Sequence, residues 1–195
     1  MKNPAIQKLF KANQGVLTSR ELMNQGISHY DIRRLLAKGI IAKVRRGIYT
    51  LNDADEHDYK VITKLIPQGI MCMFSAASFY NYSTHIPLRH HLAIYKKRKY
   101  TLPEYPPIKL YYWEKAQHEL GVEKALVDGV SINIYNREKT VCDFLKFRNR
   151  VGADVAKEVV KAYLNDPKRD IVKLKRYSHE LKISSIVDQY LTILI

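Results

Sequence analysis

The chain has 195 residues and a mass of 22.7 kDa, enough for one large domain or two small ones. Its hydrophobic share of 46% and charged share of 27% are those of a folded globular protein and exclude a disordered or collagenous chain. No apolar run approaches the ~20 residues that span a bilayer, and the amino terminus lacks a signal-peptide core, so we expect a cytoplasmic protein. Cys72 and Cys142 have apolar neighbours and are expected to be buried free thiols.

The charge of the chain is strongly positive and unevenly distributed. Lysine and arginine number 33 against 19 acidic residues, which gives a net charge of +14. Residues 1–50 contain ten basic and two acidic residues, so this quarter of the chain carries a net charge of +8. A surplus of this size predicts a polyanionic partner, and an anionic membrane surface is the less common alternative. We therefore expect the amino-terminal segment to bind nucleic acid.

Three short helices are predicted before residue 40. Residues 3–13 have apolar residues at helical spacing, and the segment ends at Gly15. Thr18 and Glu21 have the spacing of a capping box, which predicts a second helix that ends at Gly26. Ser28 can cap a third helix, which runs to a glycine at residue 39.

Residues 40–51 are rich in β-branched and aromatic residues and predict two short strands joined by a turn at residues 45–47. Three helices followed by a basic hairpin are the order of a winged helix-turn-helix. The acidic residues 53–58 then mark a boundary. We expect a DNA-binding domain at residues 1–55 and a second domain at residues 59–195.

The third helix is predicted to be the recognition helix. Ile32, Leu35 and Leu36 form one apolar stripe, which leaves the basic residues on the opposite side. The first turn of such a helix contacts base edges, while the hairpin contacts phosphates. An ordinary solvated basic face is the alternative. The predicted DNA contacts are Ser28, His29, Tyr30, Arg33, Arg34, Arg45 and Arg46.

The second domain is predicted to be mixed. Strands are expected at residues 91–95, 108–113 and 130–135, where apolar residues alternate or run together. The fold class is therefore α/β, or more closely α+β, with a winged helix followed by a mixed α/β domain. Helices are expected at residues 59–66, 74–82, 139–147 and 155–164, with a helical tail at 171–194.

Two blocks of motifs resemble the AbiEi-type antitoxins of bacterial abortive-infection toxin–antitoxin pairs. The winged-helix block consists of residues 15–22, 26–28, 35–36 and 44–49. The carboxy-terminal block consists of residues 74–78, 86–87, 118–122 and above all 135–145, YNREKTVCDFL. The resemblance covers nearly the whole chain. Cys142 and Phe144 stand where mainly aliphatic residues are expected, but both are apolar.

The resemblance implies a function in defence against phage. An antitoxin of this type binds inverted repeats in its own promoter through the winged helix and represses the operon. Its carboxy-terminal domain counteracts a cognate nucleotidyltransferase toxin without needing a stable complex. A winged-helix regulator whose second half is an effector or oligomerisation module, with no antitoxic role, is the alternative.

No enzyme, metal site or cofactor is expected. A nucleotidyltransferase needs a Gly-Ser turn before its paired carboxylates, and the sequence has no Gly-Ser. The acid-x-lysine patterns at residues 58–60 and 180–182 lie in no convincing strand, which disfavours a nuclease. His85, His90 and His91 lack zinc-ligand spacing and are expected at a polar surface or against DNA.

Two further basic segments are possible interaction surfaces. In the 137–145 helix, spacing sends the apolar residues inward and leaves Arg137, Lys139 and Asp143 to solvent, where they form a candidate antitoxin face or merely solubilise the helix. The run 96–99 contains four basic residues flanked by Tyr95 and Tyr100. A solvated loop is the ordinary interpretation of that run, and a nucleic-acid contact is the alternative.

Overall fold

A computed structural model describes residues 4–13, 15–52, 58–103 and 105–194. By its contacts the chain forms two compact units. The first unit contains residues 1–67 together with 100–107 and 127–130, and the second contains the remainder. This grouping places residues 58–67 with the amino-terminal elements, whereas the sequence analysis divided the chain between residues 55 and 59. That division stays a prediction.

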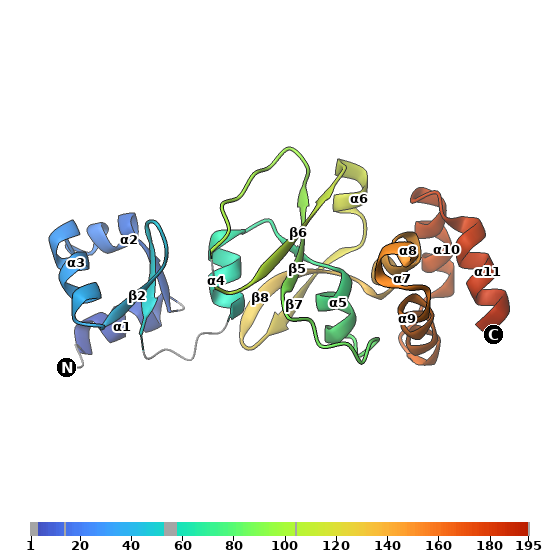
Figure 1. The fold of residues 1–195 in the computed structure, drawn as a ribbon, viewed down its shortest axis with the longest axis horizontal. Helices are drawn as coiled ribbons and strands as arrows, with labels where there is room; N and C mark the ends of the chain where they lie inside the picture. Colours follow the sequence, from blue (N-terminus) through green and yellow to red (C-terminus); the bar gives the residue numbers. More distant parts are fainter. Residues whose placement is uncertain (1–3, 14, 53–57, 104, 195) are drawn as a thin grey trace. The chain divides into compact units, whose positions relative to one another are not determined.

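The amino-terminal elements form a winged helix-turn-helix, as predicted (Figure 1). Three helices pack on an antiparallel sheet of order β1-β3-β2. Phe10 and Leu22 are completely buried in their shared core. The elements are α1 (Pro4–Ala12), β1 (Val16–Thr18), α2 (Ser19–Asn24), α3 (His29–Ala37), β2 (Ile41–Arg45) and β3 (Ile48–Leu51). Strand β1 was not predicted, because three residues are too few to show a period.

Both predicted capping boxes are present. The backbone N–H of Glu21 donates to the Thr18 hydroxyl at 3.2 Å, and the Thr18 backbone N–H donates to the Glu21 carboxylate at 2.7 Å. Ser28 and Asp31 repeat the arrangement at the start of α3. These bonds satisfy amides that the first turn of a helix leaves without partners, so they fix where α2 and α3 begin.

The predicted hairpin is the wing, defined here as β2, β3 and their turn. The turn consists of Arg46 and Gly47, and Gly47 has a φ of +78°, a conformation that a side chain disfavours. The β2–β3 register shifts between Lys43 and Arg45, which marks a bulge just before the turn.

The second unit is built on a mixed five-stranded sheet of order β6-β5-β4-β8-β7. Strand β4 pairs antiparallel with β5 and parallel with β8, and β5 pairs parallel with β6. The predicted strands β5, β6 and β8 are confirmed. The elements before and within this sheet are α4 (Asp58–Leu65, in the first unit), β4 (Ile70–Met71), α5 (Met73–Phe79), β5 (His90–Tyr95), β6 (Ile108–Trp113), α6 (Lys115–Glu119), β7 (Val122–Val127) and β8 (Val130–Tyr135).

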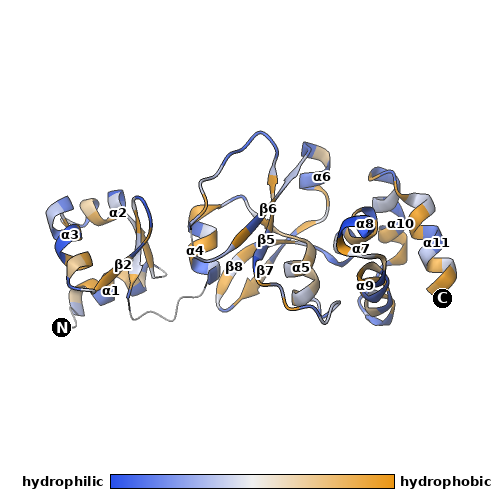
Figure 2. Cartoon of the chain, viewed as in Figure 1, coloured by the Kyte–Doolittle hydropathy of each residue, from blue (hydrophilic) through white to orange (hydrophobic). Residues whose placement is uncertain are grey.

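Five carboxy-terminal helices complete the second unit (Figure 1). Helix α7 packs against α5, α9, α10 and α11, so helices cover it on several sides. The predicted helical tail consists of two helices, α10 and α11. Figure 2 shows hydrophilic and hydrophobic residues on these helices, as expected where one face is buried. The five helices are α7 (Arg137–Lys146), α8 (Arg148–Val151), α9 (Ala153–Asn165), α10 (Ile171–Glu180) and α11 (Ser184–Leu194).

Within the described residues, no helix has the length and apolar character that crossing a membrane requires. Cys72 and Cys142 are free and buried, as predicted.

Candidate nucleic-acid interface

The outer face of α3 is polar, exposed and basic. Ile32 and Leu35 are 2% and 8% exposed, so the predicted apolar stripe faces the core. Tyr30 is 69% exposed although it is a large aromatic residue. A free aromatic ring beside two cations suits contact with bases and phosphates. The predicted contacts on this helix and at its start are all exposed: Ser28, His29, Tyr30, Arg33 and Arg34.

Ser28 has a second task at the start of α3. Its hydroxyl donates to the Asp31 carboxylate at 2.6 Å and accepts from the Asp31 backbone N–H at 3.1 Å. The bond from the hydroxyl to the carboxylate, together with one from the Ser28 backbone N–H to the same carboxylate at 3.2 Å, lowers the pKa of Asp31. Because its hydroxyl caps the helix, Ser28 fixes the start of α3 and so positions His29 and Tyr30. The exposed Ser28 side chain can also contact DNA.

The two wing arginines differ in exposure. Arg46 lies in the turn and is exposed, whereas Arg45 is half-buried and its Nε has no hydrogen-bond partner among the described residues. Lys43 on β2 is exposed and is a wing cation that the sequence analysis did not include among the contacts. Its place in the same basic hairpin as Arg45 and Arg46 is the signal that could have identified it.

The predicted antitoxin face is not a solvent-exposed surface, so that prediction is wrong. Lys139 and Asp143 are both 0% exposed, and Lys139 Nζ donates to both Asp143 oxygens at 2.6 Å. The same ammonium lies 4.1 Å from the centre of the Tyr135 ring. Burial raises the pKa of Asp143, and the positive charge of Lys139 opposes that effect. The prediction failed because it assumed one solvated side, whereas helices cover α7 on several sides.

Arg137 is half-buried and also has partners within the protein. Its Nε donates to Asp166 Oδ2 at 2.8 Å, and its guanidinium lies 4.7 Å from the centre of the Tyr80 ring. A hydrogen bond from Tyr82 and the Arg137 guanidinium lower the pKa of Asp166 to about 2. The side chain of Arg137 is only 27% exposed.

His91 is not at a polar surface, contrary to the prediction. It is 7% exposed, and its Nδ1 lies 2.9 Å from the hydroxyl of Tyr111. Burial lowers its pKa to about 4. His85 is exposed and His90 is half-buried.

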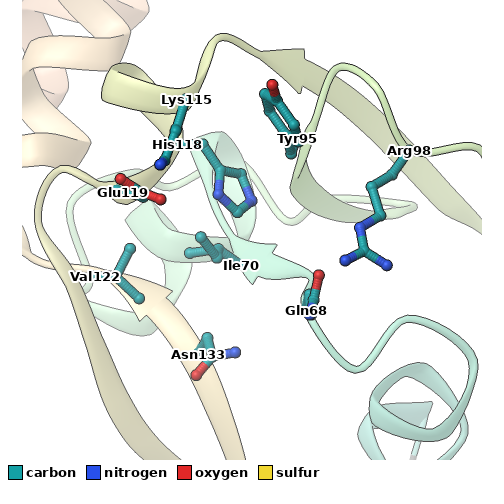
Figure 3. A pocket seen from close by; sticks show the side chains of 9 residues that line it. All are labelled: Gln68, Ile70, Tyr95, Arg98, Lys115, His118, Glu119, Val122 and Asn133. Carbon is teal, nitrogen blue, oxygen red and sulfur yellow. The ribbon is translucent and has the colours of Figure 1, made fainter.

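The second unit also contains a pocket of about 470 Å³ over the sheet (Figure 3). Residues from β4, β5, α6, β7 and β8 line it, so segments that lie far apart in the sequence meet there. Arg98, from the basic run 96–99, is one of them. Sequence reasoning did not identify the pocket, because it exists only where these elements meet.

Comparison with solved structures supports the observed fold. The crystal structure of the RV2827C protein from Mycobacterium tuberculosis matches with a TM-score of 0.57 and covers 96% of this chain and 79% of that one. At 13% sequence identity this similarity shows a shared fold. No curated protein matches the chain.

A family comparison identifies the winged helix. Residues 4–52 match a family described as "Transcriptional regulator, AbiEi antitoxin". These residues contain the whole described winged helix-turn-helix, from α1 to β3. Over residues 4–52, this chain therefore matches the AbiEi antitoxin family of transcriptional regulators, which confirms the winged-helix block of the resemblance, while the carboxy-terminal block stays a prediction.

Proposed function

We propose that the chain is the antitoxin and autorepressor of a bacterial toxin–antitoxin operon that acts in abortive phage infection. The winged helix binds inverted repeats in its own promoter, and the second unit counteracts a cognate nucleotidyltransferase toxin. The observation that carries this proposal is the family match over residues 4–52.

The exposed chemistry of α3 supports DNA as the partner. Arg33 and Arg34 are exposed on the side of the helix opposite to its buried stripe, and no hydrogen bond or ion pair within the described residues engages either guanidinium. Arginine side chains that are free of internal partners can form bidentate bonds with guanine or with phosphate. Arg46 in the wing adds a cation suited to the neighbouring phosphates.

The DNA-binding part is tested with the full chain and a fluorescent duplex from upstream of its own gene. Changing Arg33, Arg34 and Arg46 to alanine should weaken binding strongly. The matched control changes Lys157, Lys161 and Lys168 to alanine. All three are exposed in the second unit, so the control removes the same number of positive charges from another surface. If both triple variants lose affinity equally, the winged helix is not the DNA-binding surface.

The antitoxic part is tested by searching beside the gene of this chain for a nucleotidyltransferase gene and coexpressing the two. The triple variant of Arg33, Arg34 and Arg46 should still rescue growth, because these residues lie outside the second unit. Failure of the folded wild-type chain to rescue growth would reject the antitoxic role. The pocket in the second unit favours a second candidate function, a transcription regulator with an effector domain, and that function survives such a failure.

A further inference from the structure

The pocket in the second unit combines cations, amides and apolar surface. Figure 3 shows Lys115, His118 and Glu119 on one side of Ile70, with Arg98 and Gln68 on the other. Its volume of about 470 Å³ lies within the usual range of small-molecule sites, about 300–1,000 Å³. The pocket is therefore large enough for a ligand rather than for a few waters.

Four polar side chains of this pocket have no side-chain partner among the described residues. Arg98 and Lys115 form no ion pair or side-chain hydrogen bond with any described residue. Gln68 and Asn133 likewise make no side-chain hydrogen bond with the described part of the chain. Lys96 provides the contrast within the same basic run, because it pairs with Glu114. The pocket thus holds two cations and two amides that are free to bind a ligand.

Hydrogen bonds to the backbone hold both sides of the pocket in place. The turn that carries Arg98 is closed by a bond from its N–H to the Tyr95 carbonyl at 2.9 Å. On the other side, the Tyr135 hydroxyl donates to the carbonyl of His118 at 3.0 Å. Because these bonds anchor the backbone on both sides, mainly the exposed side chains remain to be ordered when a ligand binds.

Each group in the pocket matches a different part of one ligand class. Arginine and lysine recognise phosphate, and an asparagine or glutamine amide offers both the donor and the acceptor that a base edge requires. The Tyr95 ring, with Ile70 and Val122, provides apolar surface for a flat heterocycle. The Glu119 carboxylate can accept hydrogen bonds from sugar hydroxyls.

We propose that this pocket binds a nucleoside phosphate through its two cations, Arg98 and Lys115, and its two amides, Asn133 and Gln68. An isolated phosphate or a sugar phosphate would leave the amides and the apolar surface unused. The chemistry is shared by a free mononucleotide and by a nucleotide at the end of an RNA strand. The proposal does not rest on the antitoxin function or on DNA binding.

The test is isothermal titration calorimetry of the full chain with AMP, GMP, CMP and UMP. At least one should bind with a Kd below about 1 mM, and its nucleoside and inorganic phosphate alone should each bind at least about tenfold more weakly. Arg98→Ala and Lys115→Ala should weaken binding by about tenfold or more. Both side chains are exposed, so thermal melting should show folded variants.

The matched control is Lys97→Ala, which removes an exposed cation from the same basic run but not from the pocket. It should leave affinity within about twofold of the wild type. Equal losses for Lys97→Ala and Arg98→Ala would show general charge attraction and overturn the proposal. So would the absence of binding by all four nucleotides, or a nucleoside that binds as tightly as its phosphate.

A competition experiment distinguishes the two sources of the ligand. A short single-stranded RNA that displaces the bound mononucleotide, and that loses affinity on Arg98→Ala but not on Lys97→Ala, supports an RNA end as the natural ligand. If the RNA does not displace the mononucleotide, a free nucleotide is supported instead. Neither result depends on promoter binding or growth rescue.

Discussion

Lys139 and Asp143 form a completely buried ion pair one helical turn apart on α7. The ammonium lies 2.6 Å from both carboxylate oxygens and also faces the Tyr135 and Trp113 rings. Desolvation of two charges is costly, and the mutual attraction, the hydrogen bonds and the aromatic rings offset that cost only while both partners are present. The pair is therefore a point where the second unit is sensitive to single substitutions.

Breaking this pair from either side should destabilise the protein strongly. Lys139→Met or Asp143→Leu should each lower the free energy of unfolding by about 3–5 kcal/mol, because each leaves one buried charge without a partner. The double variant should lose much less than the sum of the two, as urea denaturation would measure. Additive losses would contradict a coupled pair. Lys175→Ala serves as the control, because its pair with Asp188 is exposed and should contribute little.

The helix and the wing should contribute differently to DNA binding. Arg33→Ala or Arg34→Ala should cost about 1–3 kcal/mol on the promoter and less on a scrambled duplex, if the residue contacts bases. Arg46→Ala should weaken both duplexes about equally, because wing cations contact phosphates. Fluorescence anisotropy at several salt concentrations measures both effects. Equal losses on both duplexes for all three variants would assign every arginine to the backbone.

Removal of the Ser28 hydroxyl should act on stability as well as on DNA binding. Ser28→Ala should cost about 1 kcal/mol of unfolding free energy, because it removes the cap of α3. Ser28→Thr retains a hydroxyl cap and should recover most of that stability. Thermal or urea unfolding measures the stability of the two variants. His29→Ala is the control, because it changes the next residue and leaves the cap of α3 intact. A stable Ser28→Ala variant that still fails to bind DNA would assign the hydroxyl to the interface instead.

His91 should make the second unit less stable in acid. Its pKa is about 4 in the folded chain and 6.5 ordinarily, so the unfolded chain binds the proton more readily between those values. Stability should therefore fall as pH decreases from 6.5 to 4, by up to about 3 kcal/mol from this residue. His91→Gln, compared with exposed His85→Gln, should flatten that part of the stability profile. If both variants keep the wild-type slope, His91 is not the titrating group.

Gly121 should tolerate a side chain less well than Gly129. Both have positive φ, +71° and +75°, so alanine strains the backbone at each. At Gly121 a Cβ would also lie 2.7 Å from the Cβ of Lys139, whereas at Gly129 no atom lies within 4 Å. Gly121→Ala should lower the melting temperature clearly more than Gly129→Ala does. Equal shifts would show that backbone strain accounts for the whole effect.

Features that depend on neighbouring residues were predictable from the sequence. The capping boxes at Thr18 and Ser28 join residues three apart, so their spacing alone places the starts of α2 and α3. The apolar stripe of α3 and the basic wing follow from the helical and strand periods. These local signals, together with the net charge of residues 1–50, were sufficient to predict the winged helix and its exposed basic face.

Burial in the second unit could not be predicted in this way. Lys139, Asp143 and His91 are polar, and nothing adjacent to them in the sequence indicates that other elements cover them. Strand β4 has two residues and owes its position to pairing with β5 and β8. The pocket around Arg98 likewise combines segments from residue 68 to residue 133. A repeating pattern reports which side of one helix or strand is apolar, but contacts between distant segments decide how many of its sides are covered.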